Sequence, residues 1–154
     1  MLFLDHANLF GCAETTLMTL ESGLGLEGGP GPSAVMALNG GVAYSGEICG
    51  ALTGAAVAAG LMASAVEPDH AAAKQRARAA AARMIEEFRQ EFGAVRCRDL
   101  VGCDLSSREA HEAFISGGQW KTVCMRQIEF TVSRFPAIAG GQPQAPAAGS
   151  EDRP

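Results

Sequence analysis

The stretch from Ile48 to Val66 contains no charged residue over nineteen positions, and most of its residues are Ala, Gly, Ser, Thr or Cys. A segment of this length can cross a bilayer or lie at the centre of a helical bundle, apolar on every side. Its small residues give only a weakly favourable free energy of transfer from water into a membrane. Neither an aromatic belt nor a Lys/Arg cluster flanks the segment. We therefore predict a buried central helix and no membrane span.

A glycine-rich turn leads into this helix and delivers Cys49 to its first turn. Three glycines form the turn, namely Gly40, Gly41 and Gly46. Unpaired backbone N–H groups and the positive end of the helix dipole favour an anion at this place, so we predict a lowered pKa for Cys49. Gly50 and Gly54 then leave the helix a bare face for close packing.

Apolar residues at helical spacing predict further helices on both sides of the central one. The predicted helices are residues 5–23, 33–38, 68–93 and 119–135, and one more that contains His111, Phe114 and Ile115. In the first of them Asp5 is the predicted N-cap and Glu14 is expected to be exposed. The helix with His111 is predicted to begin with a capping box formed by Ser106 and Glu109, and in the last helix Cys124 is expected to face the core. No stretch alternates with period two. The sequence predicts an all-α fold, a compact helical bundle with an apolar Ala/Gly-rich central helix and short extra helices.

The chain divides into one folded unit and a tail. Residues 1–135 form a single predicted domain, and the Pro/Ala/Gly-rich residues 136–154 are predicted to be disordered. The net charge of −5 and the absence of a long basic run argue against nucleic acid as a partner. The N-terminus has no cationic region before its apolar residues, so we expect no secretory signal and a cytoplasmic location.

Five cysteines lie on different predicted elements, and none forms a CxxC motif. In a cytosolic chain they indicate reduced thiols, a metal site or redox chemistry, and their odd number prevents complete pairing within one chain. A free cysteine commonly behaves as a small buried hydrophobe, so a purely packing role stays open. Arg96 and Arg98 would either favour a thiolate at Cys97 or form a solvated basic turn. The three histidines, His6, His70 and His111, lack metal-ligand spacing and are predicted to lie on the surface.

Cys49-Gly50-Ala51-Leu52-Thr53-Gly54 is a CGAxxG element, with Cys12 upstream and Cys97-Arg98-Asp99-Leu100 and Cys124 downstream. This order resembles the redox-active family named for its cysteine pattern, C-GCAxxG-C-C, over about residues 8–132. The resemblance assigns the four family cysteines to Cys12, Cys49, Cys97 and Cys124 and leaves Cys103 as an additional one. It implies redox or metal chemistry, and related modules look to be fused to or near redox proteins, including haem proteins. Covalent c-type haem is not expected, because the chain has no CxxCH motif.

Three hypotheses follow. The first is a metal centre held by Cys12, Cys49, Cys97 and Cys124 that serves electron transfer or redox sensing. An iron–sulfur cluster is the first choice for this centre, and another thiolate-bound metal is the second choice. The second is metal-free thiol–disulfide chemistry with Cys49 as the attacking thiolate. The third is an assembly module that uses the small-residue face of the central helix. The first two require a redox partner protein, and the third a homo-oligomer or another subunit.

Overall fold

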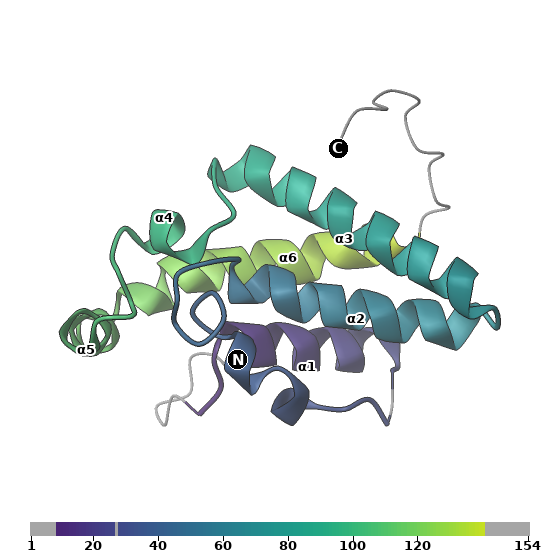
Figure 1. The fold of residues 1–154 in the computed structure, drawn as a ribbon, viewed down its shortest axis with the longest axis horizontal. Coiled ribbons are helices and arrows are strands. Elements are labelled where there is room, and N and C mark those ends of the chain that lie inside the picture. Colours follow the sequence, from purple (N-terminus) through teal and green to yellow (C-terminus); the bar gives the residue numbers. More distant parts are fainter. Residues whose placement is uncertain (1–8, 27, 141–154) are drawn as a thin grey trace, which may run out of the picture.

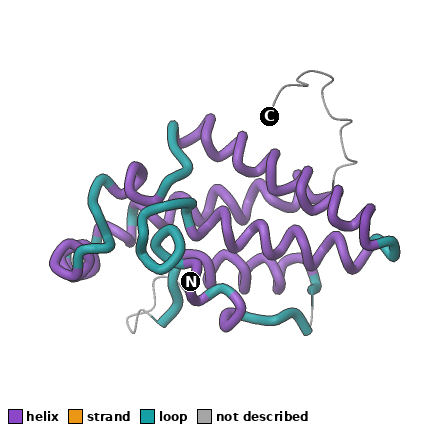
Figure 2. Tube along the Cα trace, in the orientation of Figure 1, coloured by secondary structure: helices purple, strands orange, loops and turns teal. Residues whose placement is uncertain are grey.

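The structure, a computed structural model, describes residues 9–26 and 28–140. These residues form six α-helices and three short 3-10 helices. The elements are α1 (Cys12–Leu24), η2 (Pro32–Ala34), η3 (Met36–Leu38), α2 (Gly50–Val66), α3 (His70–Phe92), α4 (Cys97–Val101), α5 (Arg108–Ser116), η4 (Gln119–Lys121) and α6 (Val123–Gly140). Within the two described ranges the backbone forms no strand (Figure 2), and the predicted all-α fold is confirmed.

Helix α2 is the centre of the bundle. It packs between α1 and α3, and α6 contacts all three of these helices (Figure 1). The alanines of α2 explain this position, because their small side chains let the neighbouring helices approach; Ala51, Ala55, Ala58, Ala59 and Ala63 are all buried. The predicted central helix is confirmed. No helix in the described part of the chain combines the length and hydropathy that a bilayer span requires.

Two helices approach each other closely where α1 and α2 begin. A Cβ atom added to Gly54 would lie 2.6 Å from the carbonyl oxygen of Ala13, and one added to Gly50 would collide with Sγ of Cys12. The two helices therefore begin side by side, with Cys12 of α1 against the first residue of α2. At these two glycines the small-residue face predicted for assembly is covered by α1 of the same chain.

The ends of α3 agree with the prediction from sequence. The side chain of Asp69 accepts a hydrogen bond from the backbone N–H of Ala72 at 2.9 Å, and Gly93 ends the helix in the left-handed conformation. On its outer side, Glu87 of α3 accepts hydrogen bonds from Arg134 of α6. Local caps thus define α3, and an exposed ion pair links it to the last helix.

Other helix ends differ from the prediction. Helix α1 begins only at Cys12, and the proposed N-cap Asp5 lies outside the described residues. Ser107, not Ser106, caps α5, since its side chain accepts from the N–H of Ala110. The predicted short helix over residues 33–38 is two 3-10 turns, η2 and η3.

Helix α6 begins after the separate turn η4 and continues through Pro136 to Gly140, where we predicted an end at Phe135. Pro136 itself is exposed, and the buried side chains of Ile138 and Ala139 hold the last turn against the bundle. A proline removes one helical N–H, yet this packing outweighs the loss. The rest of the predicted tail, residues 141–154, lies outside the described residues.

The glycines of α2 provide a matched test of the close contact. Gly54→Ala should lower the free energy of unfolding by about 1–3 kcal/mol, because its Cβ has no space beside Ala13. Gly60→Ala is the control in the same helix, since a Cβ there meets nothing within 4 Å. It should raise stability by up to about 1 kcal/mol, the gain in helix propensity. Chemical denaturation measures both, and equal effects would contradict the contact.

Candidate functional site

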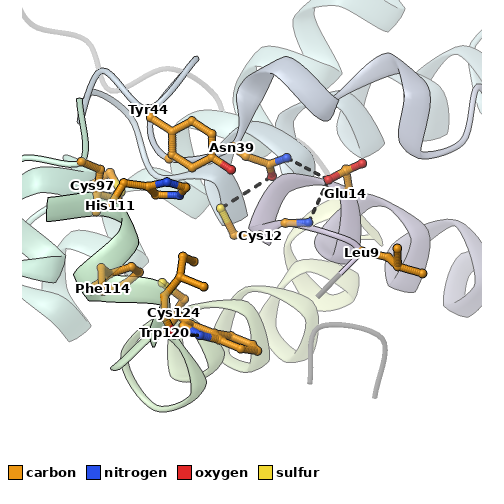
Figure 3. A pocket seen from close by; sticks show the side chains of 14 residues that line it. Leu9, Cys12, Glu14, Asn39, Tyr44, Cys97, His111, Phe114, Trp120 and Cys124 are labelled. Atoms are coloured by element: carbon orange, nitrogen blue, oxygen red, sulfur yellow. Dashed lines mark hydrogen bonds between the residues drawn. The ribbon is translucent and has the colours of Figure 1, made fainter. Parts of the chain in front are cut away.

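A cavity of about 150 Å³ lies at the end of the bundle where α1, α5, α6 and the loop before α2 meet (Figure 3). Three cysteines from three helices line it, namely Cys12, Cys97 and Cys124. Asn39, Tyr44 and His111 add polar groups, and the apolar part of the wall includes Leu105, Phe114, Ile115 and Trp120. The wall of this cavity therefore contains three of the four cysteines that the sequence singled out.

Cys49 and Cys97 lie on two chain segments that pair with each other. The backbone N–H of Cys49 donates to the carbonyl of Val95 at 2.9 Å, and the N–H of Cys97 donates to the carbonyl of Glu47 at 2.6 Å. Cys49 precedes the first residue of α2 as its N-cap and is buried. Its Sγ donates to Oε1 of Gln127 at 3.4 Å, and Cys49 does not line the cavity.

Cys12 is the first residue of α1, and its sulfur is surrounded by backbone amides. The N–H groups of Gly40, Ala13, Cys12 and Gly50 each lower the pKa of its thiol, as expected at the start of a helix. Burial raises the pKa and is the larger effect, so the net shift is upward. The thiol also points to Oδ1 of Asn39 at 3.9 Å.

Asn39 caps α1 from a distant loop. Its Oδ1 accepts from the N–H of Ala13 at 2.9 Å, and its Nδ2 donates to Oε2 of Glu14 at 2.8 Å. The same carboxylate oxygen accepts from the N–H of Gly11, whose missing side chain leaves the space that Asn39 fills. The prediction that Glu14 is exposed is therefore wrong, because Glu14 belongs to this buried network that positions Cys12.

The lowered pKa predicted for Cys49 is wrong. Burial raises its pKa well above the ordinary value, and a negative charge on Cys12 would raise it further. The amide of Ala51 at the start of α2 does lower it, as the helix dipole argument requires, but by less than burial raises it. The start of α2 therefore lowers the pKa of Cys49 as predicted, but desolvation raises the same pKa by more.

The pKa values of Cys97 and Cys124 are also raised, so both thiols stay neutral. Burial raises the pKa of Cys97 to about 12, followed by repulsion from Cys12 and Cys103. The predicted help from Arg96 and Arg98 is missing, because both are exposed and pair with Glu47 at 2.9 and 3.2 Å. The pKa of Cys124 is raised for the same reasons, burial first and then Cys12, Cys97 and Cys103. The thiols are therefore near enough to repel one another when ionised.

The loop before α2 is a left-handed turn. Five consecutive residues, Gly40 to Tyr44, have positive φ, and at Val42, Ala43 and Tyr44 the values are 65°, 52° and 60°. This conformation costs a non-glycine residue about 1–2 kcal/mol. The turn places the ring of Tyr44 against that of His111, with centroids 4.4 Å apart. Such strain typically occurs at functional sites, where the surrounding structure holds it in place.

His111 and Asn39 are the site residues that the sequence prediction missed. His111 was expected on the surface but is partly buried in the cavity wall. Its spacing to Phe114 and Ile115, three and four positions on, was the available signal, because it puts all three on one helix face. His70 is exposed as predicted, and His6 lies outside the described residues. No local pattern marks Asn39, since its partners are 25 and 26 positions away.

The thiols surround the cavity without converging on one point. In residues 9–26 and 28–140, no group of three or more His, Cys, Asp or Glu side chains is arranged to hold a metal ion. All five cysteines are free. The arrangement thus supplies soft donors around a space, with no preformed site for a single ion.

Comparison with protein families gives one match. The sequence model of the family described as "Putative redox-active protein (C_GCAxxG_C_C)" matches residues 10–137, from just before α1 to near the end of α6. All five cysteines lie within this range. Comparison with curated proteins and with solved structures gave no match.

Replacing Val42 tests the strain in the left-handed turn. Val42→Gly should raise the free energy of unfolding by up to about 1 kcal/mol, because glycine accepts positive φ and Val42 is 42% exposed. Val66→Gly is the control, an exposed valine at the last position of α2 without positive φ, and should lower stability by up to about 1 kcal/mol. Urea titration gives both values. A loss of stability in both variants would show that the turn is not strained.

The raised thiol pKa values predict a pH dependence for the metal-free protein. Above pH 9 the unfolded chain releases the Cys97 proton, whereas the folded protein retains it up to about pH 12. Stability should therefore be fully present below pH 9 and fall as the pH rises to 12, by about 1.4 kcal/mol per pH unit for each such thiol. Denaturation at several pH values measures the slope. Cys97→Ser should make it shallower, and an unchanged slope would contradict the assignment.

Proposed function

The chain belongs to the C_GCAxxG_C_C family of redox-active proteins, and we propose that it holds an iron–sulfur cluster for electron transfer or redox sensing. The observation that supports this most is that Cys12, Cys97 and Cys124, from three different helices, face one cavity of about 150 Å³. Thiolates are the usual protein ligands of such clusters, and a site can be assembled from distant helices as well as from a local motif.

The chemistry of the donor set fits a bound cation. Burial and mutual repulsion keep the thiols of Cys97 and Cys124 protonated, and a negative charge on Cys12 would raise both pKa values further. Iron bound between them would replace the protons and offset the repulsion. A single zinc ion would require ligands gathered at about 2.3 Å from one point, and the described residues offer no such group. A cluster distributes its ligands over several irons, so it suits thiols spaced around a cavity.

Cys49 is the fourth thiol that the family resemblance assigns to the site. Its sulfur donates to Gln127 and lies outside the cavity lining. To act as a ligand it would have to leave Gln127 and turn toward the cavity. The cavity itself therefore presents three of the four proposed thiols.

A bound iron–sulfur cluster supplies reversible one-electron transfer. The chain's own residues would set its environment. Leu105, Phe114 and Trp120 form an apolar wall that limits access of water. The amides of Gly40, Ala13 and Gly50 face the sulfur of Cys12 and would stabilise negative charge there. Hydrogen bonds to ligand sulfurs and exclusion of solvent both affect the reduction potential of such clusters.

We propose further that the protein works in the cytoplasm with a redox partner protein. All five cysteines are free, which suits a reducing compartment. Electron transfer requires a donor or acceptor near the site, and Tyr44 at the cavity is 41% exposed. A homo-oligomer stays a prediction from the sequence.

Metal-free thiol–disulfide exchange is the second candidate function. The raised pKa of Cys49 argues against this residue as the attacking thiolate, because the neutral thiol is a poor nucleophile. Cys12 is better placed for that role, since four backbone N–H groups oppose the rise in pKa that burial causes and the residue is only partly buried. Cys97 or Cys124, across the same cavity, would be the resolving thiol.

Metal analysis of single-cysteine variants tests the cluster. Protein purified without oxygen should be coloured and contain iron and acid-labile sulfide. Cys12→Ser, Cys97→Ser and Cys124→Ser should each lose most of the iron, because each removes a ligand. Cys103→Ser is the matched control, since Cys103 is partly buried but does not line the cavity. It should retain iron, and circular dichroism verifies the fold of every variant.

Folded, colourless wild-type protein that takes up no iron on anaerobic reconstitution would refute the cluster. In that case alkylation rates read by mass spectrometry separate the remaining functions. Fastest reaction at Cys12 would support thiol exchange, and uniformly slow reaction at all five cysteines would support a packing role.

A further inference from the structure

His111 is a further side chain in the cavity wall with an unused metal donor. Its Nε2 atom is buried and makes no hydrogen bond to any described residue. Cys49, in contrast, lies outside the wall, and its thiol already has Gln127 as a partner. The cavity thus presents four soft or borderline donors, three sulfurs and one imidazole nitrogen.

The packing around His111 holds the imidazole in the cavity. Phe114 and Ile115 on the same face of α5 line the same wall. The ring of Tyr44 covers the imidazole at a centroid distance of 4.4 Å and an angle of 55°. Figure 3 shows the His111 ring extending beneath Tyr44 in the direction of Cys12. The strained turn that carries Tyr44 therefore has a structural consequence, which is to keep this imidazole in place.

Two other polar groups of the wall, Asn39 and one carboxylate oxygen of Glu14, already have hydrogen-bond partners. Oε2 of Glu14 accepts hydrogen bonds from Asn39 and from the N–H of Gly11. The amide of Asn39 donates to Glu14 and accepts from Ala13. These hydrogen bonds tie Asn39 and Oε2 of Glu14 to the start of α1. His111 loses no hydrogen bond within the described structure when it binds one.

We propose that His111 is the fourth ligand of the cluster, bound through Nε2, in place of Cys49. This inference rests on the proposed function, because it requires that a cluster occupies the cavity. Iron–sulfur clusters accept imidazole in place of thiolate, and the substitution raises the reduction potential, since a neutral donor replaces an anionic one. The protein would then hold its cluster with three cysteines and one histidine.

Nitrogen coupling in pulsed electron paramagnetic resonance tests this ligand directly. Protein labelled with ¹⁵N-histidine, reduced to its paramagnetic state, should show strong coupling to one histidine nitrogen. His70→Gln, a change at an exposed position of α3, should keep the coupling. Cys49→Ser should keep both the iron and the coupling.

Two variants of His111 complete the experiment. His111→Ala should lose the coupling together with much of the iron. His111→Cys supplies a thiolate at the same position, so it should bind iron without the coupling and with a lower reduction potential than wild type.

The results separate the two proposals. Wild-type protein that binds iron without histidine coupling would overturn the His111 ligand and leave the cluster intact. Loss of iron in Cys49→Ser, with retention in His111→Ala, would likewise assign the fourth position to Cys49. Wild-type protein that binds no iron would overturn both the cluster and this ligand.

Discussion

The close contact between the beginnings of α1 and α2 is the constraint on which the site depends. Gly50 and Gly54 have no side chain, so Cys12 and Ala13 can lie directly against the backbone of α2. A larger residue at either glycine would separate the helices at the place where the cysteines gather. The glycines of the CGAxxG element therefore have a physical role that the cysteine pattern alone does not reveal, which is to bring α1 and its thiol to the start of the central helix.

Burial decides the chemistry of the thiols. Helix starts and neighbouring arginines both favour thiolates, and the backbone amides near Cys12 and Cys49 do lower the pKa of these two thiols. Removing the sulfurs from water has a larger effect, and the arginines beside Cys97 pair with Glu47 instead. Burial therefore keeps these thiols neutral. That property distinguishes these buried thiols from the exposed, low-pKa cysteine of a thiol-exchange protein.

Polar contacts between distant segments complete the site. Asn39 substitutes for a local N-cap of α1, and Tyr44 reaches His111 through a turn with positive φ at five successive residues. Both features belong to the loop before α2, which the sequence identifies only as glycine-rich. The energetic cost of the turn is acceptable because its hydrogen bonds to the preceding 3-10 segment, such as Ala43 to Ala37, fix it in one conformation.

The sequence by itself determined the helices and their buried faces, because helical periodicity, the Asp69 cap and the Gly93 stop are local properties of the chain. It also determined that the uncharged Ala/Gly helix is central, and through the order of its cysteines it indicated the family. Only the tertiary structure decided which of these side chains line one cavity, namely Cys12, Cys97, Cys124 and His111, and that Cys49 is held by Gln127. Desolvation, long-range hydrogen bonds and side-chain direction depend on residues far apart in the chain, so no local pattern could have fixed them.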